Sequence, residues 1–322
     1  MAVMRASVQE LLDSYQIRKS VKQKRALIAW LDGHAKAHGY LLTKQRYKGG
    51  LGCNLIVGSP KTAKVILSAH YDTATSALLP IVAIVGNFRV YVLSQICTFL
   101  PAIVLLWGLY EGAVFLFEGA WLVEEMVSFI WFEVPLLFLI FLNMWIIQRL
   151  VGFANRRNAN DNTSGMAVLL ALLEDLPTEL RPLVCFVFFD EEEKGLKGAK
   201  SFKRHYQKAI SATLIINFDC VAHGQQLLFI AKQKFIDSDF HEVLADVIAD
   251  EALIVDAKNH IYPSDQRVFK NSVAVVALHK MPIMGYYLSR LHSRLDVKFN
   301  AKNVEALAKM MIEFVEKIAR AM

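Results

Sequence analysis

Cysteine is scarce in this chain of 322 residues, and no two cysteines stand close together. The four cysteines form no Cys-x-x-Cys pair, which argues against a disulfide framework and against a cysteine-rich zinc site. Free thiols of this kind fit a reducing compartment. The segment 1–25 also lacks the apolar stretch of a secretory signal peptide, so we expect no secretion signal.

Positive charge is absent from one long segment of an otherwise basic chain. Residues 90–148 contain five acidic residues and no lysine or arginine, whereas the whole chain has a net charge of +6. A basic body beside an apolar segment suits an anionic membrane surface. Nucleic-acid binding is the rival interpretation of the charge, but no nucleic-acid-binding motif accompanies it. We therefore expect a lipid bilayer, and no nucleic acid, among the partners.

The same segment contains two apolar stretches that are long enough to cross a membrane. Residues 90–110 carry no charge, and residues 127–148 carry only Glu133. A helix needs about 20 residues to cross the hydrocarbon core, and buried helices of soluble proteins are rarely this long and apolar on every side. The sequence therefore predicts a two-helix transmembrane hairpin, carried by an insert at residues 74–157.

The distribution of charge predicts how this hairpin is oriented. Arginines lie on both sides of it, and the loop between its two helices carries only glutamates. The positive-inside rule places the arginine-flanked side in the cytoplasm. We therefore expect a multi-pass protein of the cell membrane whose main domain and both termini are cytoplasmic. The flanking arginines are Arg89, Arg149, Arg156 and Arg157.

Outside the insert, strand-like and helical segments alternate. The expected strands are 40–47, 53–57, 65–69, 183–189, 213–218 and 273–278, and the expected helices are 7–37 (as one or two helices), 163–176, 196–207, 238–252 and 301–321. Such alternation predicts an α/β fold in layers, with a mostly parallel central sheet. The expected domain consists of residues 1–73 and 158–322, interrupted by the insert.

Five basic residues lie among the apolar positions of the amino-terminal helical segment. A solvated helix face is the ordinary explanation of such a pattern, and contact with a membrane surface is the alternative. The residues are Arg18, Lys19, Lys22, Lys24 and Arg25.

Histidines and acids stand at the ends of several expected strands. They are His70 and Asp72, Asp161, Glu191 to Glu193, Asp219 and His292. Singly, each has an ordinary explanation: a helix N-cap for Asp161, a solvated turn for the glutamates and a structural role for His70. Together they converge, because the carboxyl ends of parallel strands meet at one edge. Divalent cations would relieve the repulsion among the acids, and mixed imidazole and carboxylate ligands suit zinc.

In these motifs the chain resembles the di-zinc aminopeptidases typified by secreted bacterial leucyl aminopeptidases, to which glutamate carboxypeptidase II and glutaminyl cyclase are related. The resemblance covers about residues 38–320 apart from the insert. The matching segments are SAHYDT (68–73), NDNTSGMA (160–167), FFDEEEKGLKGA (188–199), INFDCVAHG (216–224) and LHSRLD (291–296), with Ser264-Asp265-Gln266 and Phe269 as a further element.

The resemblance implies a three-layer zinc exopeptidase fold that holds two Zn²⁺ ions. His70 and Asp219 would bind one zinc, Glu193 and His292 would bind the other, and Asp161 would bridge them. Two metals about 3.5–4 Å apart activate a water and polarise the scissile carbonyl.

The same resemblance assigns two supporting roles. Glu192 would be the general base that moves the proton of the water, and Asp72 would orient His70. The pattern E-E-x-G-L-x-G sets this register and leaves Glu191 as an additional acid without a catalytic role.

The activity implied is the removal of N-terminal residues from peptides. Carboxypeptidase, dipeptidase or glutaminyl cyclase-like activity on the same fold are alternatives, as is a non-catalytic scaffold homologue. Cyclisation usually needs one zinc, and scaffold homologues lose ligands, whereas the full ligand set is present here. Peptide preference and oligomeric state stay open.

The chain departs from the family pattern in two places. Relatives have a short loop where the insert stands. They also often place an aromatic oxyanion donor near the last zinc-binding histidine, where this chain has Leu291. Tyr262, Tyr286 or Tyr287 would have to supply the donor.

Overall fold

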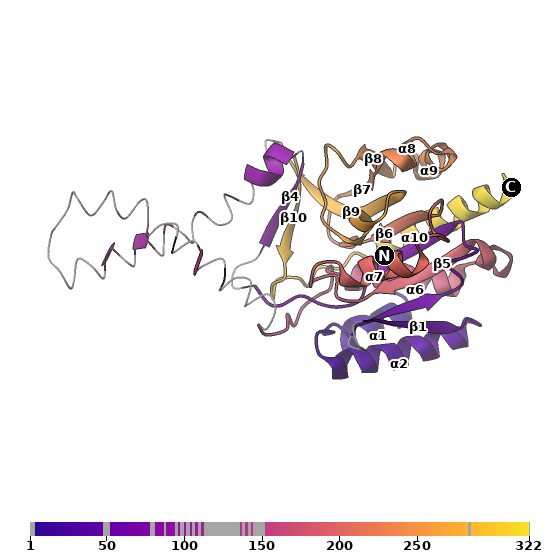
Figure 1. Ribbon diagram of the computed structural model, residues 1–322, viewed down its shortest axis with the longest axis horizontal. Helices are drawn as coiled ribbons and strands as arrows, with labels where there is room; N and C mark the ends of the chain where they lie inside the picture. The colour runs from indigo at the N-terminus through magenta and orange to yellow at the C-terminus, as the bar shows by residue number, and fades with distance from the viewer. Residues whose placement is uncertain are drawn as a thin grey trace.

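The structure is a computed structural model that describes residues 4–47, 52–77, 81–86, 88–93, 152–282 and 285–321, with isolated positions between 96 and 143. Its described strands form one ten-stranded sheet in the order β1-β2-β5-β3-β6-β9-β10-β4, with β7 and β8 attached beside β9. Helices cover both faces of this sheet (Figure 1). The mixed α/β architecture agrees with the predicted fold class.

Four parallel strands form the centre of the sheet: β5 (Val184–Phe189), β3 (Val65–His70), β6 (Leu214–Phe218) and β9 (Ser272–Met281). Every residue of β3, β5 and β6 is buried. Continuous apolar runs are typical of strands that are covered on both faces. Because the four strands run in one direction, the residues that follow them meet at one edge of the sheet.

The margins of the sheet are antiparallel, so the prediction of a mostly parallel sheet holds only at its centre. β1 (Leu42–Tyr47) and β2 (Gly52–Val57) form one margin, and β10 (Gly285–Leu291) and β4 (Ile81–Val85) form the other. β7 (Gln226–Ala231) runs antiparallel to β9.

The strands β4, β7, β8 (Ala252–Asp256) and β10 were not predicted. The reasons are clear for β8 and for the pair of β4 with β10. The helical pattern expected to run to residue 252 stops at Ile248, where α9 (Asp239–Ile248) ends, and β8 begins immediately afterwards. β4 lies within the predicted insert and pairs with β10, far away in the sequence. A local pattern cannot reveal such a partner.

Two helical layers sandwich the sheet. Phe186 and Phe188 of β5 pack toward α6 (Thr163–Asp175) and α10 (Ala301–Arg320), and the alternate residues of β5 face α7 (Lys197–Tyr206). The α6 side also carries α1 (Ala6–Ser14), α2 (Val21–Ala37) and α9, whereas η4 (Asp265–Val268) lies with α7. Two short helical segments, η3 (Thr178–Leu183) and α8 (Gln233–Ile236), are also present, as are the helical residues 88–93.

Helix α6 starts directly at the edge where the central strands end. The side chain of Asn162 caps it by accepting a hydrogen bond from the backbone N–H of Gly165 at 2.9 Å. A Cβ at Gly165 would lie 2.3 Å from the carbonyl oxygen of Phe218, so only glycine allows α6 to approach β6 this closely. Asp161 is therefore not the cap, and its carboxylate is available for another role.

The two ends of the predicted insert lie side by side. Thr75 and Ala154 form an isolated antiparallel bridge, and the backbone N–H of Ser76 donates to the carbonyl of Phe153 at 2.8 Å. The predicted spans, about 90–110 and 127–148, lie mostly outside the described residues. In the part of the chain that is described, no helix is both long and apolar enough to cross a membrane.

Candidate metal centre

One carboxylate stands between two histidines at the edge of the sheet. Oδ1 of Asp161 lies 3.4 Å from Nε2 of His70, and Oδ2 of Asp161 lies 3.1 Å from Nε2 of His292. His70 ends β3, Asp161 precedes α6 and His292 follows β10. Three distant parts of the chain thus place two imidazoles on opposite oxygens of one carboxylate.

Each histidine has a second carboxylate as a neighbour. Oδ1 of Asp219, the residue after β6, lies 3.5 Å from Nε2 of His70. Oε1 of Glu193, which follows β5, lies 3.2 Å from Nε2 of His292. The structure therefore brings all five predicted ligand residues together as two groups that share Asp161.

These spacings fit a pair of zinc ions. Ligands at about 2.1 Å around a tetrahedral zinc lie about 3.4 Å from one another, and the ligand atoms here are separated by 3.1–3.5 Å. Oδ1 of Asp219 is buried and has no hydrogen-bond partner among the described residues. A buried acceptor without a donor is costly, so a cation beside it accounts for its position. Two imidazoles with three carboxylates are also a ligand set that zinc prefers.

The electrostatics of the centre indicate the same need for cations. Burial alone would lower the pKa of His292, but Glu193 and Asp161 raise it to about 10. Burial would likewise raise the pKa of Asp161, whereas hydrogen bonds from His292 and His70 hold it well below its usual range. Without metal, protonated histidines compensate the acids. Bound cations would take over that compensation and leave the imidazoles neutral, as ligands must be.

The carboxylate of Asp72 contacts the turn formed by Glu191 to Glu193 rather than the ring of His70. Its Oδ1 accepts from the backbone N–H of Glu192 at 3.0 Å, and its Oδ2 accepts from that of Glu193 at 3.3 Å. Nδ1 of His70 lies 3.7 Å from Oδ1 of Asp72 but only 3.1 Å from its main-chain carbonyl oxygen. The expected orientation of His70 therefore comes from the carbonyl, while the carboxylate positions Glu192 and Glu193.

Glu192 lies close enough to the centre for its charge to interact with the charges of His70 and Glu193. Burial raises its pKa well above the usual range, the positive charge of His70 opposes this, and Glu193 adds to it. Oε1 of Glu191 forms an ion pair with Lys194 at 3.2 Å. The register in which Glu191 is the additional acid stays a prediction.

Two further acids interact with the charges of the centre, and neither was assigned a role from the sequence. Asp296 accepts hydrogen bonds from the backbone N–H groups of Asn160 and Asp161 at 2.9 and 3.0 Å, which fixes the loop that carries Asp161. Asp265 is fully buried, and neither of its carboxylate oxygens has a hydrogen-bond partner among the described residues. Both residues belong to the quoted motifs LHSRLD and Ser-Asp-Gln, which were the available signal.

The prediction of a solvated basic face on the amino-terminal segment is wrong for Arg18. Its guanidinium is fully buried, with Nε donating to the carbonyl of Tyr71 and Nη1 donating to Oγ1 of Thr163 at 3.0 Å. Burial lowers its pKa to about 10, against the charges of Asp72 and Asp161, which raise it. A cation beneath the acid cluster stabilises it, whereas Lys22 and Arg25 are exposed as expected.

Of the three tyrosines left open as oxyanion donors, Tyr262 contacts a residue of the ligand set. It is buried, and its hydroxyl is 3.5 Å from the carbonyl oxygen of Asp219. Tyr286 and Tyr287 lie on β10, where their rings are near His260 and His279, respectively.

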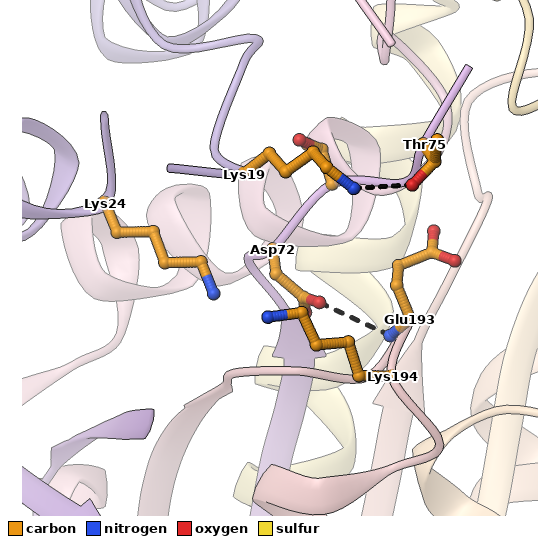
Figure 2. A pocket seen from close by; sticks show the side chains of 7 residues that line it. Lys19, Lys24, Asp72, Thr75, Glu193 and Lys194 are labelled. Atoms are coloured by element: carbon orange, nitrogen blue, oxygen red, sulfur yellow. Dashed lines mark hydrogen bonds between the residues drawn. The ribbon is translucent and has the colours of Figure 1, made fainter. Parts of the chain in front are cut away.

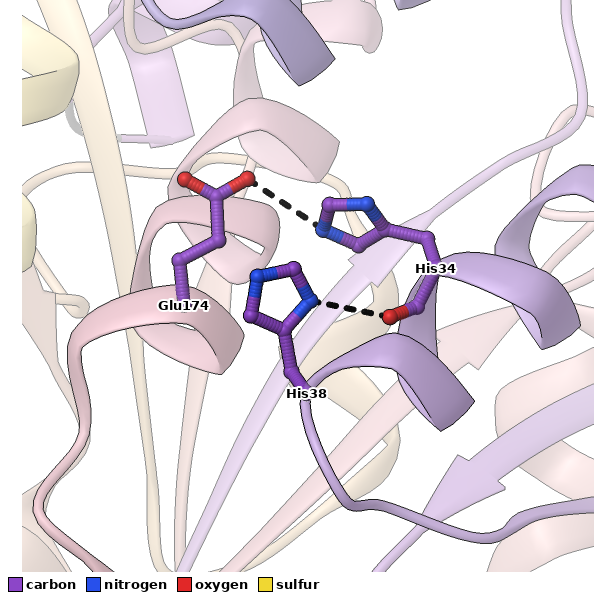
Figure 3. Close-up of side chains that lie close together, drawn as sticks. All are labelled: His34, His38 and Glu174. Atoms are coloured by element: carbon purple, nitrogen blue, oxygen red, sulfur yellow. Dashed lines mark hydrogen bonds and ion pairs between the residues drawn. The ribbon is translucent and has the colours of Figure 1, made fainter.

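A third group of possible ligands lies between α2 and α6: His34, His38 and Glu174 (Figure 3). Its carboxylate already binds donors of the protein, because Glu174 accepts from Arg5 at 3.0 Å and from the hydroxyl of Ser7, and lies 3.2 Å from Nε2 of His34. Burial would raise the pKa of Glu174, but these donors lower it to about 2. The group thus ties the amino-terminal helices to α6.

Comparison with known proteins agrees with this geometry. The family model described as peptidase family M28 matches residues 151–315. No curated protein sequence matches the chain significantly.

Solved structures similar to the chain share its fold. An aminopeptidase from Legionella pneumophila matches with a TM-score of 0.55 and 13% identity, over 97% of this chain and 68% of that one. A glutaminyl cyclase from Porphyromonas gingivalis matches with a TM-score of 0.58 and 15% identity, over 96% of this chain and 95% of that one. A Zn-dependent exopeptidase from Parabacteroides distasonis matches with a TM-score of 0.56 and 13% identity, over 96% of this chain and 95% of that one.

Proposed function

Because the chain belongs to peptidase family M28 and is a zinc metallopeptidase, we propose that it is a two-zinc aminopeptidase that removes N-terminal residues from peptides. The observation that carries this proposal is the position of Asp161, which presents one oxygen to His70 and the other to His292. His70 with Asp219 would hold one zinc, and His292 with Glu193 would hold the other. Zinc there supplies an acidified water and polarises the scissile carbonyl.

The protein's own groups would position the substrate and move the proton. Glu192 would take a proton from the attacking water and deliver it to the leaving amine, as a general acid–base group. Burial raises the pKa of Glu192 above its usual range, which favours the protonated form that this exchange passes through. Asp72 holds the turn that carries Glu192 and Glu193, so base and ligand keep a fixed separation.

Glutaminyl cyclisation is the second candidate, because several of the similar structures are glutaminyl cyclases. Two complete ligand groups favour hydrolysis, since a cyclase usually needs one zinc. A scaffold without catalysis is a third possibility, and the complete ligand set argues against it.

A peptide panel distinguishes these functions. The purified protein, loaded with zinc, is incubated with a short peptide that has a free N-terminus, with its N-acetylated form, and with a peptide that begins with glutamine. Release of the first residue from the free peptide alone supports an aminopeptidase. Ammonia release from the glutamine peptide without bond cleavage supports a cyclase. Cleavage of the acetylated peptide at its carboxyl end would contradict both.

We also propose that residues 74–157 carry a membrane hairpin that anchors the catalytic domain at the cytoplasmic face of the cell membrane. The two apolar stretches support this, as does the bridge that joins the ends of the insert. Large apolar side chains at described positions in and beside the insert are exposed, and Phe153 is 92% exposed. An apolar surface of this extent needs a cover of lipid or protein. Examples spaced at helical intervals are Phe88, Val92, Ile96, Leu100 and Val104.

Topology can be tested by thiol labelling in intact cells. Single cysteines replace Glu118 and, separately, Arg157 in a background without the native cysteines, and an impermeant thiol reagent is added. The proposal expects labelling at position 118 and none at position 157 until the cells are opened. Labelling at position 157 in intact cells would contradict the cytoplasmic placement of the catalytic domain.

A further inference from the structure

A small cavity opens beside the metal centre, and three lysines line it together with Asp72 and Glu193. Figure 2 shows Lys19 on one side of this cavity, Lys194 below it and Lys24 to the left. Asp72 and Glu193 belong to both the cavity and the centre. A group bound in the cavity would therefore lie next to Glu193, one of the proposed zinc ligands.

Two of the three lysines already have acidic partners. Lys24 forms an ion pair with the buried carboxylate of Asp190, and Lys194 lies 3.2 Å from Oε1 of Glu191. Lys194 keeps two of its three ammonium protons for other acceptors. The ion pair of Lys194 is also partly exposed, so it is a weak one that an incoming anion can share.

Lys19 differs from the other two. Its Nζ donates to the hydroxyl of Thr75, and no carboxylate of a described residue lies within ion-pair distance of it. Burial lowers the pKa of Lys19 and repulsion from Lys194 lowers it further, whereas the charges of Glu193 and Asp72 oppose this without cancelling it. A half-buried ammonium group near a second ammonium is stabilised by an anion placed between them.

The length of a short peptide allows its own carboxylate to be the anion that binds in this cavity. One residue spans about 3.3–3.6 Å. If the leaving side of a peptide bound at the metal centre runs past Glu193, its next one or two residues reach the cavity. The free carboxylate of a dipeptide or tripeptide ends at that distance, whereas a longer peptide has an uncharged amide there.

We propose that Lys19 and Lys194 bind a carboxylate on the leaving side of the substrate, so that the enzyme prefers di- and tripeptides with a free C-terminus. This inference rests on the proposed aminopeptidase function. An acidic side chain directly after the scissile bond would offer the same chemistry, and the test separates the two sources.

The test compares a dipeptide, its C-terminal amide and an amidated dipeptide with glutamate as second residue. We expect the wild-type enzyme to cleave the free acid with a kcat/KM about tenfold to a hundredfold above that of the plain amide, which is the usual effect of one charge-assisted hydrogen bond. Lys19→Met should remove most of this difference, through a higher KM for the free acid. Lys22→Met, which changes an exposed lysine in the first turn of α2, is the control.

Each result has a defined meaning. If the amidated glutamate dipeptide recovers the preference, the carboxylate site is supported and the side chain is its source. If acid and amide are cleaved equally by the wild type, or if Lys19→Met affects both alike, the carboxylate inference is wrong and the aminopeptidase proposal stands. If no peptide with a free N-terminus is cleaved, the aminopeptidase proposal fails and this inference fails with it.

Discussion

Replacement of Asp72 by asparagine tests what this carboxylate does. Asp72 is only 3% exposed, and its two oxygens accept the backbone N–H groups of Glu192 and Glu193. Asparagine has the same shape but one oxygen, so in either orientation its NH₂ group faces one of the two donors. One charge-assisted hydrogen bond is lost and the other becomes neutral.

The structure sets the size of the effect. A hydrogen bond to a charged group contributes about 1.5–3 kcal/mol, and each 1.36 kcal/mol changes a rate tenfold. If the displaced turn misplaces Glu192 in the transition state, kcat should fall about 10- to 150-fold. His70 should keep its orientation, because the main-chain carbonyl that Nδ1 contacts is unchanged.

Steady-state kinetics and zinc analysis on the same preparation decide between the two roles of Asp72. We expect a reduced kcat with zinc retained on the His70 side, and Asp13→Asn, an exposed surface change, should match the wild type. Loss of zinc from the His70 side, with normal turnover per remaining intact centre, would refute this reasoning. Asp72 would then act on His70, as the sequence suggests.

Three further predictions concern the charges. Glu192→Gln should keep the zinc content near normal and reduce turnover about 10²–10⁴-fold, whereas Glu193→Gln should lower zinc occupancy. Elemental analysis and kinetics measure both effects. The reverse pattern would show that the assignment of Glu192 and Glu193 is shifted by one residue. Asp161→Asn should lower occupancy of both zinc positions from the two per chain expected in active protein, and loss of only one would exclude a bridging role. Glu174 has a folded-state pKa of about 2, below its usual 4.5. Its contribution to stability is therefore present above pH 4.5 and lost as the pH falls toward 2, so Glu174→Gln should flatten acid unfolding, followed by circular dichroism, in that window.

The sequence alone indicated the class of the fold, and together with the family resemblance it gave the candidate residues of the centre. Alternating apolar runs and helices encode a parallel centre, because a strand covered on both faces must be apolar throughout. His70 and Asp219 directly follow two of these runs. Parallel strands end at one edge of the sheet, so residues that follow them converge there. This convergence can be predicted without knowing any other tertiary contact.

The tertiary structure alone decided how these residues are supported. The antiparallel pairing of β4 with β10, the burial of Arg18 and the two backbone hydrogen bonds of Asp72 each join segments far apart in the chain. Nothing in a local pattern distinguishes a buried arginine from a solvated one, or tells which donors a carboxylate meets. The cavity between Lys19 and Lys194 has the same origin. Apolar periodicity depends on residues that are neighbours in the sequence, so it can be recognised locally. The partners of a charged side chain depend on which distant segments the packed sheet brings beside it.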